Sequence, residues 1–251
     1  MPIERVDVLG IPVDLATTPQ VLREVRRAVV DQRRLHIVTV NAEFVVHARQ
    51  NLAFRRVLED ADLATADSAG ILWALRRQGY YLHYRVGGSD LVWSMSLQAA
   101  EFGHRIFFLG GGPGVAEAAA GQLVDTFPEL QIAGTHAGRP NIGDEAAIVH
   151  LIRRSKADLL FVAFGAPEQD QWLARNQSRT GAPVALGVGG SLDYIAGRTR
   201  RAPVWMRQNQ LDWLWRLTQQ PWRWRRMLAL PRFAWLVWRD TKGRTTKRKY
   251  R

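Results

Sequence analysis

Polar turns that could line a binding cleft follow four short apolar runs of this chain. The turns begin at Asn41, Asp67, Gly165 and Gly189, and they supply amide, carboxylate and hydroxyl side chains. In open α/β folds, ligands bind outside the carboxyl ends of the strands, so residues at these places are the first candidates for a site. Helix capping would explain any single one of these turns about as well. Four polar strand ends together favour a ligand-binding cleft.

A glycine-rich turn, Gly110–Gly114, also follows an apolar run and precedes a helical pattern. Backbone N–H groups in such a turn can hold a phosphate, although tight packing of a strand on a helix explains the glycines about as well. The spacing does not match a dinucleotide fingerprint, because the third glycine would fall at Val115. The turn therefore predicts a possible phosphate contact and gives no support to NAD binding.

The Asp60-Ala-Asp62 sequence matches the D-x-D pattern with which many nucleotide-sugar enzymes hold a divalent metal. It stands between a helical pattern and a strand, where carboxylates are usually solvated, so no metal is expected there. The six histidines lack the paired helical spacing of a zinc site, and the chain contains no cysteine. Neither a G-x-S-x-G sequence nor a P-loop is present, which leaves hydrolase and NTPase functions without support.

The elements that must position these turns alternate between strand and helix along residues 1–197. Short, nearly continuous apolar runs suit a parallel sheet that is covered on both faces. Repeated βα units therefore predict a doubly wound, Rossmann-like α/β fold with a mostly parallel sheet. The predicted strands are Arg5–Val8, Leu35–Val40, Leu63–Ala66, Arg105–Leu109, Leu130–Gly134, Asp158–Phe164 and Pro183–Val188. The predicted helices are Pro19–Asp31, Ala42–Asp60, Gly70–Arg77, Ser89–Glu101, Pro113–Phe127, Asp144–Lys156 and Glu168–Arg179.

Charge divides the chain near Gly197. Residues 198–251 contain 16 Lys and Arg against two acidic residues, whereas residues 1–197 contain 19 basic and 21 acidic side chains. Seven of the ten tryptophans also lie in residues 198–251. We therefore predict a Rossmann-like domain over residues 1–197 and a helical, basic, Trp-rich appendage over residues 198–251. A basic aromatic appendage on a nearly neutral domain indicates an anionic surface as its partner.

Two kinds of anionic surface fit the appendage. Basic residues interleaved with tryptophan are typical of single-strand nucleic-acid binding, which makes a nucleotide-binding domain with a nucleic-acid-binding arm the alternative function. Large apolar residues at helical spacing favour a membrane interface instead, with tryptophan at head-group depth and arginine near anionic lipid. These apolar residues are Trp213, Leu214, Leu217, Phe233, Leu236 and Val237. No apolar run reaches the roughly 20 residues that a membrane-spanning helix needs, and no secretory signal is expected.

The sequence also predicts the internal structure of the appendage. Pro221 and Pro231 should divide it into short helices, because proline interrupts a helix. Trp205 and Trp213 are expected to be buried against the first domain, and the tryptophans from Trp222 onward to be less so. The basic stretch from Lys242 to the end of the chain is expected to be disordered.

At the same strand ends, the chain resembles the bacterial WecG/TagA/CpsF glycosyltransferases, which form glycosyltransferase family 26. The resemblance covers roughly residues 5 to 240 in order, and its most specific part begins at Gly187. The matching stretches are Thr39–Glu43, Ala61–Asp67, Arg85–Leu91, Phe108–Gly111, Gly165–Trp172, Gly187–Gly197, Arg201–Met206 and Leu211–Leu217. One departure is that the usual Asp-Gly of the family reads Asp67-Ser68 here.

The resemblance implies a peripheral enzyme at the cytoplasmic face of a bacterial plasma membrane. It would move a sugar from a UDP-sugar to a polyprenyl-diphosphate-linked saccharide during the synthesis of a cell-surface polymer. The family reaction inverts the anomeric centre without a D-x-D metal, so the resemblance implies no cofactor. It implies no nucleic-acid partner, and it leaves homo-oligomerisation possible.

The resemblance also assigns roles to residues of the first domain. An inverting transfer needs a carboxylate that takes the proton of the acceptor hydroxyl, and the match places Asp67 in this role. Thr39 and Asn41 are assigned to positioning the sugar or the acceptor. Gln169 and Asp193 are placed toward the nucleotide, where a carboxylate could accept hydrogen bonds from uracil or ribose.

Cationic groups are expected to stabilise the negative charge of departing UDP. Arg85 and the turn at Gly110 and Gly111 are the candidates in the first domain. The appendage arginines Arg216, Arg223 and Arg226 match family residues that meet a diphosphate, a task that suits the planar guanidinium group. Contact of the same arginines with lipid head groups is the alternative.

Overall fold

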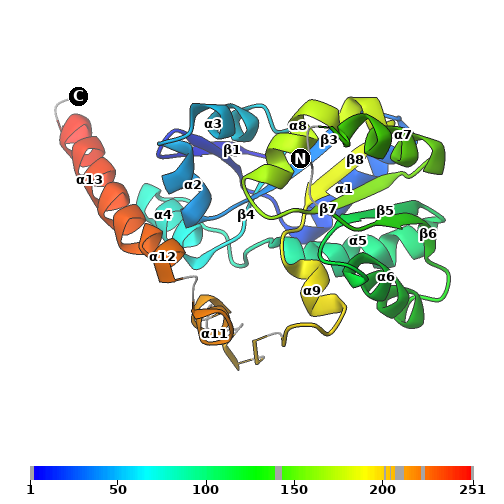
Figure 1. Ribbon diagram of the computed structural model, residues 1–251. Helices are drawn as coiled ribbons and strands as arrows, with labels where there is room; N and C mark the ends of the chain where they lie inside the picture. The colour runs from blue at the N-terminus through cyan, green and yellow to red at the C-terminus, as the bar shows by residue number, and fades with distance from the viewer. Residues whose placement is uncertain are drawn as a thin grey trace.

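The computed structural model describes residues 3–138, 143–200, 202–203, 205–206, 212–221 and 224–249, without the side chains of residues 216, 225 and 242–249. Its centre is a single eight-stranded sheet in the order β1-β2-β4-β3-β8-β7-β5-β6, with helices on both faces (Figure 1). All neighbouring strands run parallel except β1 and β2. The predicted Rossmann-like α/β fold is confirmed. The strands are β1 Arg5–Val8, β2 Ile11–Asp14, β3 Leu35–Val40, β4 Leu63–Ala66, β5 Arg105–Gly110, β6 Gln131–His136, β7 Leu159–Ala163 and β8 Val184–Gly187.

The helices cover the sheet in groups that each bury an apolar stripe. One core cluster joins α1, α5, α6 and α9 to the sheet, a second contains residues of α2, α3, α4 and α13, and a third lies beneath α7 and α8. The helices of the first domain are α1 Thr18–Val30, α2 Ala42–Ala48, α3 Leu52–Glu59, α4 Ala69–Gln78, α5 Gly88–Phe102, α6 Val115–Thr126, α7 Glu145–Ser155, α8 Glu168–Thr180 and α9 Ser191–Ile195. Three described helices follow: α11 Asp212–Gln219, α12 Trp224–Met227 and α13 Ala229–Lys249.

Strand β2 was missing from the sequence prediction. It pairs with β1 as an antiparallel hairpin and lies between β1, the edge strand, and β4. Asp14 at its end is buried and accepts hydrogen bonds from Arg5 at 2.7 and 2.8 Å and from the backbone N–H of Ala64 at 2.6 Å. Its four residues include Pro12, and proline normally argues against a strand. The pairing of β2 with β4 is at Asp14, whereas Pro12 is in register with Asp7 of β1, so its missing N–H does not interrupt the parallel pairing.

The single helix predicted over Ala42–Asp60 is wrong, because the structure contains α2 and α3 there. Asn51 separates the two helices, and its side chain accepts a hydrogen bond from the N–H of Phe54 at 2.9 Å as the N-cap of α3. A side chain that caps the next helix offers the backbone an alternative to continuing the first one. The apolar spacing on both sides of Asn51 concealed this break.

Helix α13 of the appendage forms part of the protein core. It packs against α2 and α4, and Phe233 and Val237 are each 2 % exposed within the second core cluster (Figure 1). The Arg77 side chain of α4 also donates a 3.5 Å hydrogen bond to the hydroxyl of Thr241. The apolar face that the sequence predicted for a membrane is thus buried, around Phe233, against the first domain.

Other predictions for the appendage are also corrected. Pro231 lies in the first turn of α13 and does not interrupt it, because a proline there removes an N–H that has no partner within the helix. The backbone stays helical to Lys249, through the stretch predicted to be disordered. Trp205 and Trp213 are 59 % and 41 % exposed, so the prediction that they are buried is wrong. Tryptophan content alone does not show which ring faces the core.

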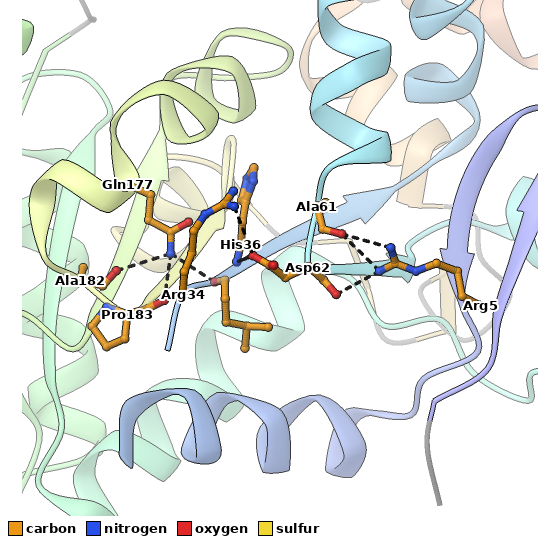
Figure 2. Close-up of polar contacts among 9 residues, drawn as sticks. Arg5, Arg34, His36, Ala61, Asp62, Gln177, Ala182 and Pro183 are labelled. Atoms are coloured by element: carbon orange, nitrogen blue, oxygen red, sulfur yellow. Dashed lines mark hydrogen bonds and ion pairs between the residues drawn. The ribbon is translucent and has the colours of Figure 1, made fainter. Parts of the chain in front are cut away.

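Asp60 and Asp62 lie at the amino end of the sheet, away from the strand ends that carry the polar turns. Asp60 ends α3 as its C-cap, and the carboxylate of Asp62 accepts a 2.8 Å hydrogen bond from the N–H of His36 (Figure 2). Arg5 donates to the carbonyl of Asp62 at 3.0 Å, and Arg34 lies 3.9 Å from its carboxylate. These contacts give the D-x-D sequence a structural role.

Candidate active site

A cavity of about 370 Å³ lies at the carboxyl ends of β3 and β4, between the first domain and the appendage. Two of the predicted polar turns, those at Asn41 and Asp67, contribute to its wall. The other two turns lie along the neighbouring strands β7 and β8. The lining residues are Asn41, Ala42, Glu43, Asp67, Ser68, Ala69, Gly70, Arg85, Gly87, Ser89, Asp90, Tyr194, Ala202, Asp212, Trp213, Trp215, Arg226, Met227 and Leu230.

Asp67 directly follows β4 and faces the beginning of α5. Its backbone N–H donates to the carbonyl of Val40 at 2.8 Å, which extends the β3–β4 pairing by one residue. A Cβ atom on Gly87 would lie 2.2 Å from Asp67 Oδ1, so only glycine leaves room for the carboxylate. The N–H of Gly88 donates to the other carboxylate oxygen at 3.5 Å. The partial positive charge at this helix N-terminus therefore lies against the carboxylate.

The segment before α5 is held by β4. Val86 donates its N–H to the carbonyl of Ala66 at 2.8 Å, and its own carbonyl accepts a 2.8 Å hydrogen bond from the hydroxyl of Thr65. These two contacts place Gly87 and Gly88 over the end of β4. Thr39 is buried beneath Gly88, with its hydroxyl 3.5 Å from the position that a Cβ atom there would take. Thr39 therefore supports the helix start beside Asp67.

Two cavity residues are helix caps as well. Asn41 accepts a 2.9 Å hydrogen bond from the N–H of Phe44 and begins α2. Ser68 accepts from the N–H of Ile71 at 3.2 Å and begins α4. The backbone φ of Ser68 is −158°, an extended conformation that needs no glycine. The departure from the Asp-Gly pattern therefore leaves the turn after Asp67 intact.

Arg85 joins the first domain to the appendage across the cavity. Its guanidinium group lies 2.8 Å from the carboxylate of Asp212, the first residue of α11. Burial alone would lower the pKa of Arg85, but Asp212, with Asp67 and Asp90 further away, raises it. The side chain is thus a permanent cation beside Asp67, as a phosphate-binding role requires.

A second ion pair crosses the cavity between Arg226 of α12 and Glu43 of α2. Of the three predicted diphosphate arginines, the structure therefore places Arg226 in the cavity wall. The side chain of Arg216 and the whole of Arg223 lie outside the described residues. Their contact with a diphosphate stays a prediction.

The two residues predicted to face the nucleotide lie on separate helices near the same edge. Gln169 in the first turn of α8 is 3 % exposed, and its amide oxygen accepts from the N–H groups of Gly165 and Gly189. Asp193 in α9 is half-buried, and its backbone carbonyl accepts from Arg198 at 2.9 Å. Neither residue lines the 370 Å³ cavity.

The glycine turn after β5 fits the packing interpretation. A Cβ atom on Gly110 would lie 2.8 Å from the Phe164 ring and 2.9 Å from the Ala163 backbone. The N–H of Gly111 already donates to the carbonyl of Ala163 at 3.1 Å. Gly110 and Gly111 have φ values of +98° and +79°, which glycine adopts most readily. Their predicted contact with phosphate remains untested.

Several cavity residues were not singled out from the sequence. Asp212 and Asp240 are the only acidic residues of the basic appendage, and this contrast is a signal that could have marked Asp212. Glu43 lies within a stretch that carries the family resemblance, but its charge partner is 183 residues away. Ser89 and Asp90, in the first turn of α5, also lie within a stretch that carries the family resemblance. Such pairings follow from the fold and have no local pattern.

The charges of the wall suit a polar substrate that also carries phosphate. Its carboxylates can accept hydrogen bonds from sugar hydroxyls, while its arginines can contact phosphate oxygens. Within the described residues, no group of three or more His, Asp or Glu side chains is arranged to hold a metal ion. The charged lining residues are Glu43, Asp67, Asp90 and Asp212, together with Arg85 and Arg226.

Comparison with known proteins connects this geometry to a family. The model of the glycosyl transferase WecG/TagA/CpsF family matches residues 6–247. A relative from Staphylococcus aureus (strain MW2) is 31 % identical over 236 residues, which cover 93 % of this chain and 92 % of the relative. Relatives from Bacillus subtilis (strain 168) and Bacillus spizizenii (strain W23) are 30 % and 33 % identical over 84 % and 80 % of this chain, and these matches cover 81 % and 77 % of the relatives.

All three relatives carry the name N-acetylglucosaminyldiphosphoundecaprenol N-acetyl-beta-D-mannosaminyltransferase. The family match includes both the first domain and the described helices of the appendage, so it covers every wall of the cavity. The chain therefore belongs to the WecG/TagA/CpsF family and is a glycosyltransferase.

Proposed function

We propose that this chain is an inverting glycosyltransferase that moves a sugar from a UDP-sugar to a saccharide on a polyprenyl diphosphate. The observation that carries the proposal is the cavity whose wall contains Asp67, Arg85 and Arg226. Transfer of a sugar from UDP to an acceptor hydroxyl group requires a base for the hydroxyl proton and cations for the charge on the departing diphosphate. The names of the relatives support N-acetylmannosamine as the sugar and N-acetylglucosaminyl diphosphoundecaprenol as the acceptor.

Asp67 is the proposed general base. As the acceptor oxygen forms a bond to the anomeric carbon, its proton passes to the Asp67 carboxylate. The bond between the anomeric carbon and the UDP oxygen breaks on the opposite face, and UDP leaves with the electron pair. The N–H of Gly88 and the close fit of Gly87 hold the carboxylate in one orientation. A base that is fixed in this way needs little reorganisation during the reaction.

Arg85 is proposed to stabilise the charge that develops on the leaving diphosphate. Its partner Asp212 belongs to the appendage, so a shift of α11 would free the guanidinium group for phosphate oxygens. Arg226 is the proposed contact for the acceptor diphosphate, after it separates from Glu43. The proposal requires no metal, because these cations take the role that a D-x-D metal has elsewhere. The observed position of Asp62 at the other end of the sheet is consistent with this.

The appendage is also proposed to dock at the anionic cytoplasmic face of a bacterial plasma membrane. Helix α13 buries Phe233 and Val237 but leaves Trp235 and Trp238 about half exposed, so its two faces serve different partners. Exposed tryptophans beside basic residues fit the head-group region of a bilayer. No helix within the described ranges is long and apolar enough to cross a membrane.

Release of UDP tests the proposed reaction. We expect release from one member of a UDP-sugar panel only when a polyprenyl-diphosphate-linked acceptor is present. Asp67→Asn should keep donor binding but lose more than nine tenths of the turnover, whereas Asp125→Asn, on the exposed side of α6, should change neither. Turnover above a tenth of wild type in Asp67→Asn would rule out this base. Failure of every UDP-sugar would rule out the donor class.

A further inference from the structure

Two neighbouring side chains at the start of α8 lie against the last residue of β8. Gln169 and Asp170 are 3 % and 1 % exposed, and the cavity wall includes neither. A Cβ atom on Gly187 would lie 2.5 Å from Gln169 Nε2 and 2.7 Å from Asp170 Oδ1. The missing side chain of Gly187 therefore leaves the space that these two side chains fill. This packing joins α8 to β8 at the carboxyl edge of the sheet.

The amide oxygen of Gln169 joins two loops. It accepts hydrogen bonds from the N–H of Gly165 at 3.2 Å and from the N–H of Gly189 at 2.9 Å. Gly165 follows β7 and Gly189 follows β8, and the two strands are parallel neighbours. Both glycines have a positive φ, +85° and +52°, so each loop turns sharply at the point where it is held. One side-chain oxygen thus fixes the spacing of the two turns.

Asp170 lies beside the Gln169 amide. Because the amide oxygen is used by two N–H donors, the NH₂ group must turn to an acceptor, and Asp170 is its hydrogen-bonding neighbour. Burial raises the pKa of Asp170 to about 7, although the Gln169 amide acts in the opposite direction. The Oδ2 atom of Asp170 has no hydrogen-bond partner in the described part of the chain. The Gln169 amide is thus a neighbour that favours the charged form of Asp170 in this buried position.

The held loop continues into the candidate active site. Two residues after Gly189, the hydroxyl oxygen of Ser191 lies 2.8 Å from that of Ser89. Ser89 lines the cavity and belongs to the first turn of α5, which also meets Asp67. The contacts therefore run from Gln169 through the loop after β8 to the helix that orients the proposed base.

We propose that Gln169 and Asp170 are positioning residues, which hold the loops after β7 and β8 in the conformation that binds the donor nucleotide. This inference rests on the proposed function for the identity of the ligand. It differs from the predicted direct contact of Gln169 with the nucleotide, because the amide acts through Gly165 and Gly189. Donor binding then requires an oxygen at residue 169 that accepts from Gly165 and Gly189, and does not require contact between the amide and the nucleotide.

Exchanging the carboxylate and the amide between positions 169 and 170 tests this inference. In Gln169→Glu, two buried carboxyl groups face each other, and they repel once the proton that they can share is lost. Measured at pH 9, we expect the donor KM to rise at least tenfold while kcat changes less than threefold. In the double variant Gln169→Glu/Asp170→Asn, a carboxylate oxygen again accepts from both glycines and the Asn amide supplies the NH₂ group. We expect its donor KM to return to within threefold of wild type. A double variant as weak as the single one would overturn the proposal in favour of direct contact.

Hydrogen exchange tests the same contacts without donor, acceptor or turnover. We expect Gln169→Met to speed exchange of the Gly165 and Gly189 amides together by at least tenfold. Gln177→Met is the matched control, since Gln177 is a buried glutamine of the same helix whose amide donates to carbonyls at the other end of the sheet (Figure 2). It should lower the melting temperature but leave both glycine amides and the donor KM unchanged.

The two experiments separate the possible failures. Unchanged exchange at either glycine in Gln169→Met would overturn the positioning role, whatever the substrate is. If wild type releases no UDP from any donor, the proposed function fails while the exchange result still stands. If Gln169→Glu does not fold, the exchange measurement on Gln169→Met decides the question alone.

Discussion

His36 provides a test of the structure through the pH dependence of stability. The ring lies on β3 and is 1 % exposed, and its Nε2 atom has no hydrogen-bond partner among the described residues. Burial lowers its pKa to about 3, and the nearby charge of Arg34 adds to this effect. The folded protein therefore keeps His36 neutral at pH values where the unfolded chain binds a proton. His36→Gln removes this difference in proton binding between the folded and the unfolded state.

The magnitude follows from linkage between protonation and folding. Since the pKa is lowered in the folded state, the stability associated with neutral His36 is present above the unfolded pKa of about 6.5 and is lost as pH falls toward about 3. Between pH 7 and pH 5, the unfolded chain gains about 2 kcal/mol from protonation of this residue. His36→Gln should therefore become about 2 kcal/mol more stable relative to wild type over the same interval.

Asp170 should act in the opposite direction. Burial raises its pKa from 3.8 to about 7, so its contribution to stability is present below the unfolded pKa and is lost as pH rises through about 7. Between pH 7 and pH 5, the folded state gains about 2 kcal/mol from this group, which offsets the loss at His36. Asp170→Asn should therefore become less stable relative to wild type on acidification.

Urea unfolding at pH 5 and pH 7 measures both effects. Each variant is compared with wild type at the same pH, so any constant packing cost of the substitution cancels between the two pH values. His150→Gln, on the exposed side of α7, is the control and should show no pH-dependent difference. The slope m must stay constant for the comparison to hold. If the difference between His36→Gln and wild type changes by less than about 0.5 kcal/mol, the assignment of a buried neutral His36 is refuted.

Three further predictions concern the cavity and the appendage. Phe233→Ala should cost about 3–5 kcal/mol of unfolding free energy in urea, because this side chain is buried. Trp235→Ala should leave the stability within about 1 kcal/mol of wild type and weaken flotation with anionic vesicles. Equal losses of stability would contradict the assignment of a buried and an exposed face to α13. Gly87→Ala should lower turnover at least tenfold with a normal circular dichroism spectrum, since its Cβ atom would displace Asp67, and wild-type turnover would disprove this close fit. Arg226→Ala should lose most turnover even on a water-soluble acceptor analogue, whereas a pure head-group role predicts full activity there.

Local patterns predicted the centre of the fold well. Strands β3 and β4 were predicted to the residue, because their side chains are buried throughout and polar residues follow at once. The same strand ends placed Asn41 and Asp67 in one cavity. Strand β2 was missed because a four-residue strand with a proline has no distinctive local pattern. Buried apolar runs therefore predict the parallel strands better than a short strand that contains a proline.

The contacts across the cavity could not be predicted in this way. Asp212 pairs with Arg85 only because α11 is brought over the first domain, and no spacing in the sequence encodes that approach. Likewise, the apolar positions around Phe233 were predicted to face a membrane, and this prediction is wrong because protein covers them. The answer depended on the complementary surface of α2 and α4. Long-range partners are needed to distinguish a core helix from a membrane-surface helix.

The contacts of α12 and α13 imply an order of folding. Arg226 meets Glu43 across 183 residues, and Arg77 meets Thr241 across 164 residues. By contrast, Asp67 and Gly88 are only 21 residues apart. Contacts between distant residues form late because closing a long loop costs more chain entropy. We therefore expect the surroundings of the proposed base to assemble early, and the part of the cavity wall that contains Arg226 to be added late in folding.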